Sequence, residues 1–509
     1  MNFCQTRLRL VEAGAALAAV ALVAGCGNNY RPVVTPVNPS GPPAQPQSWA
    51  VVVSAPSPTA AGIATIIDYS GDSIMAFAPI GPDPTAFTID SVGASGYTID
   101  SDHTITNFPI TSSLQEKQIT YTTLLSTADP LNLFSPSNGL WAADIFGNVA
   151  DVFTGSPQTF LRSVPLASTT PAVNTPVMIM GSGTGGLRYY ALSQNLVTAT
   201  NPTPTGEECN TSPTTQPLGD VTGIEASTDT TDAPIQVGSC PVYAVQTSDG
   251  RRLFVLNRGS DTITVINAQN DTLDSCVCPP AGCVNQDNQT YTCHPTLPVS
   301  PANGLPHAGP VYAEYIIATS QLIVANYDGN SVSVIDVSLD EFGNDSSTFG
   351  TTYTIPVGNS PASVTALYDG SKAYTANQTD GTVTVVNLSS YSVEKTLAVV
   401  GHPRTVVSTQ NSEYSKIYVA SPDSSYLTII ESTPTINDLV DTTIPVEGNI
   451  VDVRTSTQNG SGGNANYVSR IPGYGQPCNL PLSEFNPATS ANPAVALFDC
   501  QVQNVANLK

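Results

Sequence analysis

Four stretches of this sequence carry an aspartate at a bend between two β-branched runs, and carboxylates at bends can hold cations or polar ligands. The stretches are LFVLNRGSDTITVIN, LIVANYDGNSVSVID, AYTANQTDGTVTVVN and IYVASPDSSYLTIIE, and their aspartates are Asp261, Asp328, Asp380 and Asp423. The segments that precede such stretches add His307, Asn359, His402 and Arg404. These residues form a candidate ligand face if the fold brings the bends together.

The same residue types have a purely structural use, because Asp and Asn tolerate positive φ and hydrogen-bond their own backbone in turns. His307 and His402 have no acidic or histidine neighbour at ligand spacing, so no metal centre is predicted, although Ca²⁺ or another divalent cation stays open. The sequence contains neither a Gly-x-Ser-x-Gly elbow nor a phosphate-binding glycine loop followed by Lys-Ser/Thr. The catalytic residues are therefore unknown, and no cofactor is predicted.

Each stretch predicts a β-hairpin, since apolar and polar residues alternate strictly in its second half, as in Val332-Ser333-Val334. A further apolar run precedes each hairpin and another follows it, which gives four antiparallel strands per unit. Repetition at roughly 45 residues is typical of propellers and solenoids. Radial packing buries both faces of such a sheet. We therefore predict an all-β fold, a β-propeller with four antiparallel strands per blade.

The blade number follows from weaker copies of the hairpin earlier in the chain. They are IATIIDY at Ile63, GYTIDSD at Gly96, GLWAADIFG at Gly139 and GLRYYALS at Gly186. The first two are too close together for a four-stranded blade each. Merging them predicts seven blades, with eight as the alternative. The apolar stretch from Ile450 is expected to pair with the strand that begins at Trp49 and so close the ring.

The repeated pattern resembles a known family. It reads Tyr-Val-Ala/Thr-Asn, a turn, a Val-x-Val-Ile-Asp strand and then Ile-Pro-Val-Gly-x-x-Pro, over residues 238–447, and it is similar to the YVTN-type β-propeller repeat. The resemblance implies a secreted or cell-surface propeller, typically with seven blades, and a more distant similarity to lactonase-like and quinoprotein-like propellers. No single activity belongs to that family, so the resemblance leaves the function open.

The N-terminus predicts an exported lipoprotein. Arg7 and Arg9 precede an apolar run that is too short to cross a bilayer stably and that ends in LVAGC. This ending resembles the bacterial lipobox, in which the cysteine, here Cys26, is lipidated; ordinary cleavage or an uncleaved anchor is the alternative. Gly27 in place of aspartate favours the outer membrane or cell surface.

The expected organisation has four parts. They are a lipoprotein signal peptide at 1–25, the lipidated cysteine and a Pro-rich tether at 26–48, the propeller at 49–456, and a Gly/Asn-rich linker with a disulfide-pinned tail at 457–509.

Eight cysteines lie beyond Cys26, and an even number in an exported chain predicts disulfides. The expected pairs are Cys209 with Cys240, Cys478 with Cys500, and two bridges among Cys276, Cys278, Cys283 and Cys293. A zinc knuckle in the last group is the alternative, although its spacing matches no paired C-x-x-C site.

Charge and motifs together limit the function. The chain has 16 basic and 40 acidic residues and a net charge of −24, so it lacks the basic stripe that nucleic-acid binding requires. We expect a lipid-anchored envelope protein, non-enzymatic on the balance of its motifs, that binds or scaffolds a protein or glycan partner. The alternatives are a lactonase-like or quinoprotein-like enzyme with a cation or cofactor at the central channel, and a structural surface-layer component.

Overall fold

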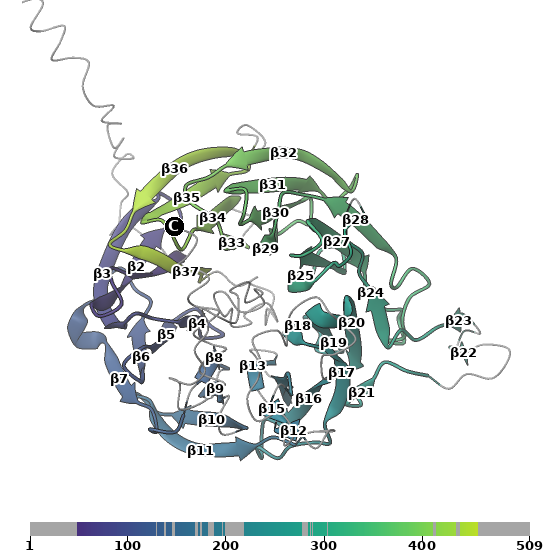
Figure 1. The fold of residues 1–509 in the computed structure, drawn as a ribbon. Helices are drawn as coiled ribbons and strands as arrows, with labels where there is room; N and C mark the ends of the chain where they lie inside the picture. The colour runs from purple at the N-terminus through teal and green to yellow at the C-terminus, as the bar shows by residue number, and fades with distance from the viewer. Residues whose placement is uncertain are drawn as a thin grey trace, which may run out of the picture. The chain divides into compact units, whose positions relative to one another are not determined.

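The computed structural model describes one ring of β-sheets (Figure 1). The described residues are 48–456 except 129, 137–138, 145–147, 168–171, 174–175, 182–187, 196, 199–217, 277–282, 286, 288, 303, 411–413 and 434–437. The predicted signal peptide, tether and tail, with Cys26, Cys478 and Cys500, therefore lie outside them. No helix in the described part of the chain is long and apolar enough to cross a membrane.

Eight sheets follow one another around the ring, and we number them as blades in chain order. Blade 1 contains β37 (Asn449–Thr455), β1 (Trp49–Ala55), β2 (Ala61–Asp68) and β3 (Ser73–Pro82). Blade 2 contains β4 (Ala86–Ile89), β5 (Ser95–Asp100), β6 (Thr104–Pro109) and β7 (Thr120–Thr123). Blade 3 contains β8 (Pro130–Phe134), β9 (Leu140–Asp144), β10 (Val149–Thr154) and β11 (Thr159–Pro165). Blade 4 contains β13 (Pro176–Gly181), β14 (Arg188–Ser193), β16 (Leu218–Glu225) and β17 (Ile235–Ser239).

The second half of the ring holds the clear repeats. Blade 5 contains β18 (Pro241–Gln246), β19 (Arg252–Asn257) and β20 (Thr262–Asn267), with β21 (Thr272–Leu273) and β24 (Thr296–Pro298) both beside β20. Blade 6 contains β25 (Pro310–Ile316), β26 (Gln321–Asn326), β27 (Ser331–Asp336) and β28 (Thr352–Pro356). Blade 7 contains β29 (Pro361–Ala366), β30 (Lys372–Asn377), β31 (Thr382–Asn387) and β32 (Ser392–Ala398). Blade 8 contains β33 (Thr405–Ser408), β34 (Lys416–Ala420), β35 (Tyr426–Glu431) and β36 (Leu439–Pro445).

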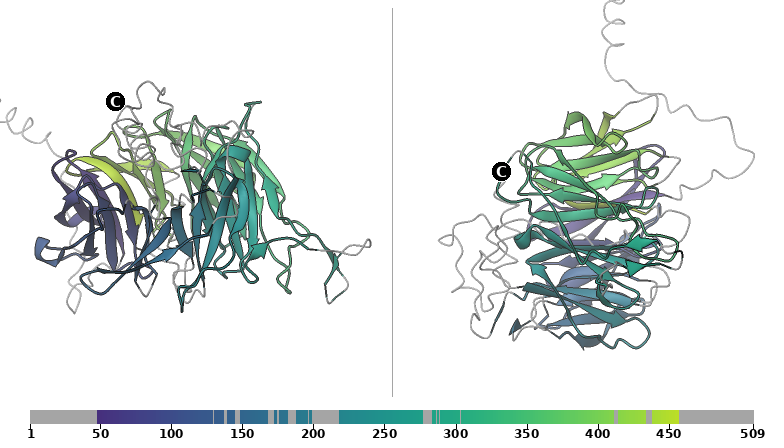
Figure 2. Two further views of the ribbon diagram at one scale, coloured as in Figure 1. Left: turned by 60° about the horizontal axis from the view of Figure 1, so that its bottom comes forward. Right: turned by 90° about the vertical axis from the view of Figure 1, so that its right-hand side faces the viewer.

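A few short elements lie outside this pattern. Small ladders pair β12 (Ala172–Val173) with β15 (Val197–Thr198), and β22 (Cys283–Val284) with β23 (Thr290–Tyr291). The β22–β23 hairpin projects outward from the ring (Figure 1). Short 3-10 helices span Glu116–Gln118 and Arg258–Ser260. In the blades, the strands run from one face of the ring to the other (Figure 2).

The all-β propeller is confirmed, and its blade number is eight, the alternative, rather than seven. The stretch at Ile63 is the third strand of blade 1, whereas the stretch at Gly96 is the second strand of blade 2. They lie close in sequence because they are not equivalent strands: only β3 and β4 separate the third strand of blade 1 from the second strand of blade 2. Merging the two stretches was therefore wrong.

The predicted closure of the ring is confirmed. Strand β37 pairs antiparallel with β1, with Val52 opposite Val453. At the edge of this ladder Ser456 N donates to Trp49 O at 2.8 Å, and Trp49 N donates to Ser456 Oγ at 2.7 Å. The closure pairs β1 on both sides, with β2 and with β37, so β1 is not an edge strand.

An asparagine fixes the bend of the hairpin in three blades. The side-chain amide of Asn377 donates to Thr382 Oγ1 at 3.0 Å and to Thr384 Oγ1 at 2.8 Å. The same two bonds join Asn257 to Thr262 and Thr264, and Asn326 to Ser331 and Ser333. All three asparagines are fully buried, so the repeated Asn and the alternating hydroxyls of the sequence form one structural unit.

The glycine that precedes a blade makes room for this asparagine. A Cβ on Gly358 would lie 2.7 Å from Asn377 Cγ, and a Cβ on Gly238 would lie 2.6 Å from Asn257 Cγ. Neither glycine has a positive φ, so the close approach and not the backbone conformation requires glycine.

This pair predicts a non-additive stability effect. We expect Gly358→Ala to cost about 1–3 kcal/mol through overpacking, and Asn377→Ala about 1–3 kcal/mol through the lost hydrogen bonds. The double variant should lose less than the sum by about 1 kcal/mol, because truncation of the asparagine removes the Cγ and Nδ2 atoms that the new Cβ would strike. Denaturant unfolding of the four proteins measures the difference, and strict additivity would contradict the packing described.

Buried carboxylates occupy the blades near the N-terminal side of the ring. Asp100 accepts hydrogen bonds from Thr98 Oγ1 at 2.8 Å and Thr106 Oγ1 at 2.6 Å, and burial raises its pKa to about 6 despite these hydroxyls. Burial also raises the pKa of Asp151 to about 6, with a further contribution from Asp144. Both carboxyl groups are therefore more easily protonated in the folded state than in the unfolded chain.

The direction of these shifts predicts that acidification stabilises the fold over a limited range. Because the folded pKa of about 6 exceeds the ordinary 3.8, the folded state binds more protons between these values. The free energy of unfolding should therefore rise as the pH falls from about 7.5 to about 5. Denaturant unfolding across this range tests it: Asp100→Asn should flatten the profile, whereas Asp287→Asn, at an exposed position between β22 and β23, should leave the slope unchanged.

Candidate functional site

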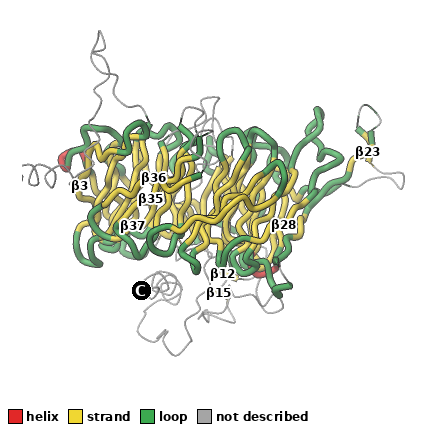
Figure 3. Tube along the Cα trace, turned by 90° about the horizontal axis from the view of Figure 1, so that it is seen from above, coloured by secondary structure: helices red, strands yellow, loops and turns green. Residues whose placement is uncertain are grey.

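The predicted bends do lie at one end of the ring. In blade 6 the register places Pro310 opposite Asn326, Asn326 opposite Ser331, and Ser331 opposite Pro356. The bend between the second and third strands therefore emerges beside the connections between blades. We call this end the connection face, and the end with the other two bends of each blade the opposite face; Figure 3 shows loops at both ends of the strands.

On the connection face, His402 and Asp423 form a tight pair. Asp423 Oδ1 accepts from the His402 backbone N–H at 2.8 Å, and Oδ2 lies 2.6 Å from His402 Nδ1. Burial alone would raise the pKa of Asp423, but the backbone and side-chain hydrogen bonds of His402 outweigh it and lower the pKa. The carboxylate thus holds the connection before β33 against the bend of the same blade.

Two further aspartates bind connections in the same way. Asp261 Oδ2 lies 3.0 Å from His307 Nδ1, and its Oδ1 accepts from the backbone N–H groups of Ala308 at 2.9 Å and Gly309 at 2.8 Å. Asp380 accepts from the backbone N–H of Asn359 at 2.7 Å and from its side-chain amide at 2.8 Å. Three of the predicted carboxylates therefore act as caps for connecting backbone.

The fourth aspartate, Asp328, pairs with the side chain of Arg258, which was not among the predicted residues. Asp328 receives two parallel hydrogen bonds at 2.9 Å from Arg258 Nε and a terminal nitrogen. Arg258 is fully buried, and its guanidinium lies 5.2 Å from the ring centroid of Tyr327. This bidentate pair joins the bends of blades 5 and 6, and its geometry favours a structural contact.

Arg404 lies at the base of the connection face, at the start of β33. Its terminal nitrogen donates to Val451 O at 3.2 Å, and Nε has no hydrogen-bond partner among the residues that the structure describes. Burial lowers the pKa of Arg404 to about 10, and the charge of Asp452 opposes this effect. Arg404 therefore packs against the closing strand β37 and not against the predicted carboxylates.

The structure thus brings the predicted residues together as pairs. Asp261 meets His307, Asp380 meets Asn359, and Asp423 meets His402, while Asp328 and Arg404 have other partners. Within the described ranges no group of three or more His, Cys, Asp or Glu side chains is placed to hold a metal ion. These pairs join bends to connections, so they favour a structural role for the predicted residues over a role in ligand binding.

The cysteine-bearing insertion of blade 5 contains a disulfide between Cys276 and Cys293. This bridge is one of the two expected within this group, and it removes both thiols from the zinc-knuckle alternative. Cys240 and Cys283 are also disulfide-bonded, and their expected partners Cys209 and Cys278 lie outside the described residues.

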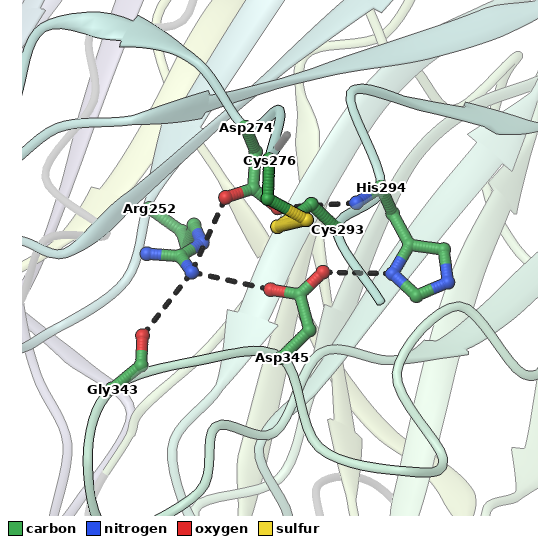
Figure 4. The surroundings of a disulfide bond; sticks show 7 residues. All are labelled: Arg252, Asp274, Cys276, Cys293, His294, Gly343 and Asp345. Atoms are coloured by element: carbon green, nitrogen blue, oxygen red, sulfur yellow. Dashed lines mark hydrogen bonds and ion pairs between the residues drawn. A yellow bond between two sulfur atoms is a disulfide. The ribbon is translucent and has the colours of Figure 1, made fainter. Parts of the chain in front are cut away.

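A buried charge cluster lies beside this disulfide (Figure 4). A terminal nitrogen of Arg252 lies 3.3 Å from Asp274 Oδ1 and 3.2 Å from Asp345 Oδ1. Asp345 Oδ2 in turn lies 2.7 Å from Nδ1 of His294, whose ring stacks on Phe349. Burial raises the pKa of Asp274 to about 6; Arg252 opposes the shift and Asp345 adds to it. The cluster fastens the disulfide-bearing insertion to blade 6.

A cavity of about 470 Å³ lies between blades 2 and 3 at the opposite face. The bend after β4 and strand β5 contribute one wall, which contains Asp90, Ser91, Val92 and Tyr97. The two bends of blade 3 at this end contribute the other wall, which contains Ser135, Pro136, Gly139, Thr154, Gly155 and Gln158. Among these described lining residues, neutral hydrogen-bonding groups predominate, with a single carboxylate.

Two polar atoms in these walls are buried from solvent and form no hydrogen bond with the described residues. They are Ser91 Oγ and Gln158 Oε1, and neither forms a hydrogen bond within the described part of the chain. The backbone of Ser91 is fixed, because its N–H donates to Ser135 O at 3.2 Å. Burial, and then the charge of Asp90, raises the pKa of Tyr97, so its phenol stays protonated. The walls of the cavity therefore contain two buried polar atoms without a hydrogen bond in the described part of the chain, and a carboxylate and a phenol lie beside them.

Sequence reasoning missed this cavity for a definite reason. Its walls come from blades 2 and 3, where the repeat is degenerate, and the merging of the first two hairpins left the bend after β4 unplaced. The stretch Asp90-Ser91-Val92-Gly93 reads as an ordinary turn, and no motif links it to Gln158. Only the pairing of blades in space brings these residues together.

Comparisons with known proteins find similarity in structure alone. No family model matches the chain, and no curated protein matches it. The dihydro-heme d1 dehydrogenase NirN in complex with DHE is 12% identical, with a TM-score of 0.53 over 82% of this chain and 77% of that one. AztD from Citrobacter koseri is 12% identical, with a TM-score of 0.50 over 80% of this chain and 97% of that one.

A putative 6-phosphogluconolactonase from Bacteroides fragilis is 14% identical, with a TM-score of 0.48 over 82% of this chain and 99% of that one. At these identities the similarities concern the architecture and not the chemistry. The chain is a β-propeller that is similar in fold to AztD and NirN.

Proposed function

We propose that this protein is a binding protein of the bacterial cell envelope and that the cavity between blades 2 and 3 holds a neutral sugar of a glycan. The observation that carries the proposal is the pair of enclosed groups without a hydrogen bond in the described part of the chain, Ser91 Oγ and Gln158 Oε1. Rotation of the two side chains toward the cavity would let a hydroxyl-rich ligand donate to Gln158 Oε1 and exchange hydrogen bonds with Ser91. A buried polar group without a partner is costly, so such a ligand would gain from satisfying both.

The remaining wall of the cavity fits the same ligand class. Asp90 has one oxygen engaged by the Ala94 N–H at 2.7 Å, and a carboxylate can accept further hydrogen bonds from sugar hydroxyls. Val92 and Pro136 offer apolar surface for the C–H face of a sugar ring. A phosphorylated or otherwise anionic ligand fits poorly, because the Asp90 carboxylate supplies the charge among the described lining residues and would repel it.

The envelope address rests on the sequence. The lipobox-like LVAGC supports lipidation at Cys26, and the Pro-rich segment after it supports a tether between lipid and propeller. The YVTN-like repeats support the same address, because that resemblance implies exported proteins. The protein would therefore present its propeller from the outer membrane or cell surface.

Titration with a panel of neutral hexose and pentose oligosaccharides, followed by saturation-transfer NMR, tests the cavity. The full chain should bind at least one saccharide, and Gln158→Ala or Ser91→Ala should weaken it about 2–10-fold, since each removes a hydrogen bond. Asp90→Asn should weaken it by about tenfold, because a charge-assisted bond becomes neutral while Asn can still accept from Ala94.

The matched control is Asp380→Asn, which changes a carboxylate on the connection face. It should leave saccharide binding unchanged. No binding by any neutral saccharide, or equal losses in the Asp380 and Asp90 variants, would rule out the cavity as the glycan site.

Mass spectrometry of the mature N-terminal peptide tests the anchor. An acylated N-terminal Cys26 is expected in membrane fractions, and Cys26→Ser should release the protein from these fractions because the thioether attachment point is lost. An unmodified Cys26, or a Cys26→Ser variant that stays membrane-bound to the same extent, would show that lipid does not anchor the chain.

A further inference from the structure

The outer edge of blade 1 carries an unusual number of exposed apolar side chains. Phe77 is 64% exposed, and Ile74 and Met75, on the same strand β3, are also exposed. On the neighbouring blade 8, Leu439 and Val440 are exposed at the start of the outer strand β36. We call these five residues the edge patch. When exposed apolar side chains cluster on a protein surface, the cluster often marks a site of interaction with a protein or a membrane.

Contacts between the two blades show that the halves of the edge patch are neighbours. Lys416 Nζ, on blade 8, lies 2.7 Å from Asp72 Oδ2, in the turn that leads into β3. Asp441, on β36, lies close enough to influence the Asp72 carboxyl group electrostatically. Asp72 is two residues before Ile74, and Asp441 directly follows Val440. The starts of β3 and β36, which carry these apolar side chains, therefore lie near each other at the rim.

The chain joins the propeller next to this patch. Trp49, the first residue of β1, lies opposite Asp68, and Asp68 lies opposite Ser73, the residue before Ile74. Two strand spacings correspond to about 10 Å. The segment that leads back to Cys26 therefore departs about 10 Å from the backbone of the edge patch.

These observations favour a lipid surface as the occupant. Residues 27–47 would span roughly 65 Å in the polyproline II conformation, so an anchor at Cys26 keeps the patch within reach of the bilayer. Such a tether raises the effective concentration of the bilayer at the patch, and a modest apolar contact then suffices. A second copy of this chain is disfavoured, because each copy has a net charge of −24.

We propose that the edge patch of Ile74, Met75, Phe77, Leu439 and Val440 docks on the membrane to which the N-terminal lipid tethers the chain. This inference rests on the anchor proposed above. The propeller then stands on its rim, with blades 8 and 1 toward the lipid, and the acidic surface favours zwitterionic over anionic headgroups.

Tryptophan quenching tests this orientation. The full acylated protein is reconstituted in phosphatidylethanolamine/phosphatidylcholine vesicles that contain brominated phosphatidylcholine. Phe77→Trp reports on the edge patch, and Tyr353→Trp, at an exposed position on the outer strand of blade 6, is the matched control. We expect several-fold stronger quenching at position 77 than at position 353, after subtraction of the signal from Trp49 and Trp141. Equal quenching at the two positions, or none, would overturn the proposal.

A second measurement separates the patch from the anchor. Cys26→Ser chains without acyl groups are floated with the same vesicles, with and without Phe77→Ser and Leu439→Ser. The two surface substitutions should reduce vesicle binding by about tenfold, since they replace the two most exposed of the five apolar side chains. Unchanged binding overturns docking even where mass spectrometry shows acylation. Vesicle binding that stays the same while sedimentation shows the loss of a dimer would assign the patch to a second copy instead.

Discussion

The ladder between β37 and β1 is the contact on which the whole ring depends. It brings together residues about 400 positions apart, and it supplies blade 1 with the inner strand that the N-terminal segment lacks. Without it, β1 and the first strands of the neighbouring blades would expose apolar residues that are now fully buried, among them Val51, Val53 and Val453. Each other blade is local in sequence, so this single long-range pairing converts a row of sheets into a closed ring.

The fold could be predicted to the level of the blade. The asparagine and the two alternating hydroxyls of each clear repeat formed the pattern that was recognised, and the structure shows that they bond to each other. The blade number could not be obtained from spacing alone, because the first two stretches are a third strand and a second strand of successive blades and not equivalent positions. The closing pair of strands was predictable because both β1 and β37 are apolar runs at the two ends of the repeats.

The candidate site was less predictable, for a related reason. Turn chemistry and ligand chemistry use the same carboxylates, and Asp261, Asp380 and Asp423 satisfy connecting backbone N–H groups. The cavity at the opposite face is made from degenerate blades whose lining residues carry no repeat. His294 likewise had no assignable partner in the sequence, because its partner Asp345 comes from the neighbouring blade 6. The repeat pattern describes single blades, so it could not predict interactions between the side chains of different blades.

The geometry of the closing ladder also sets how the ring would respond to a pulling force. Because β1 begins and β37 ends at the same edge, tension between Trp49 and Ser456 acts across the backbone hydrogen bonds and loads them one after another. Such unzipping needs far less force than shearing a ladder whose bonds are all loaded at once. A propeller that is held at Trp49 and pulled at Ser456 would therefore open first in blade 1, by separation of β37 from β1. The other seven blades would keep their local strand pairing.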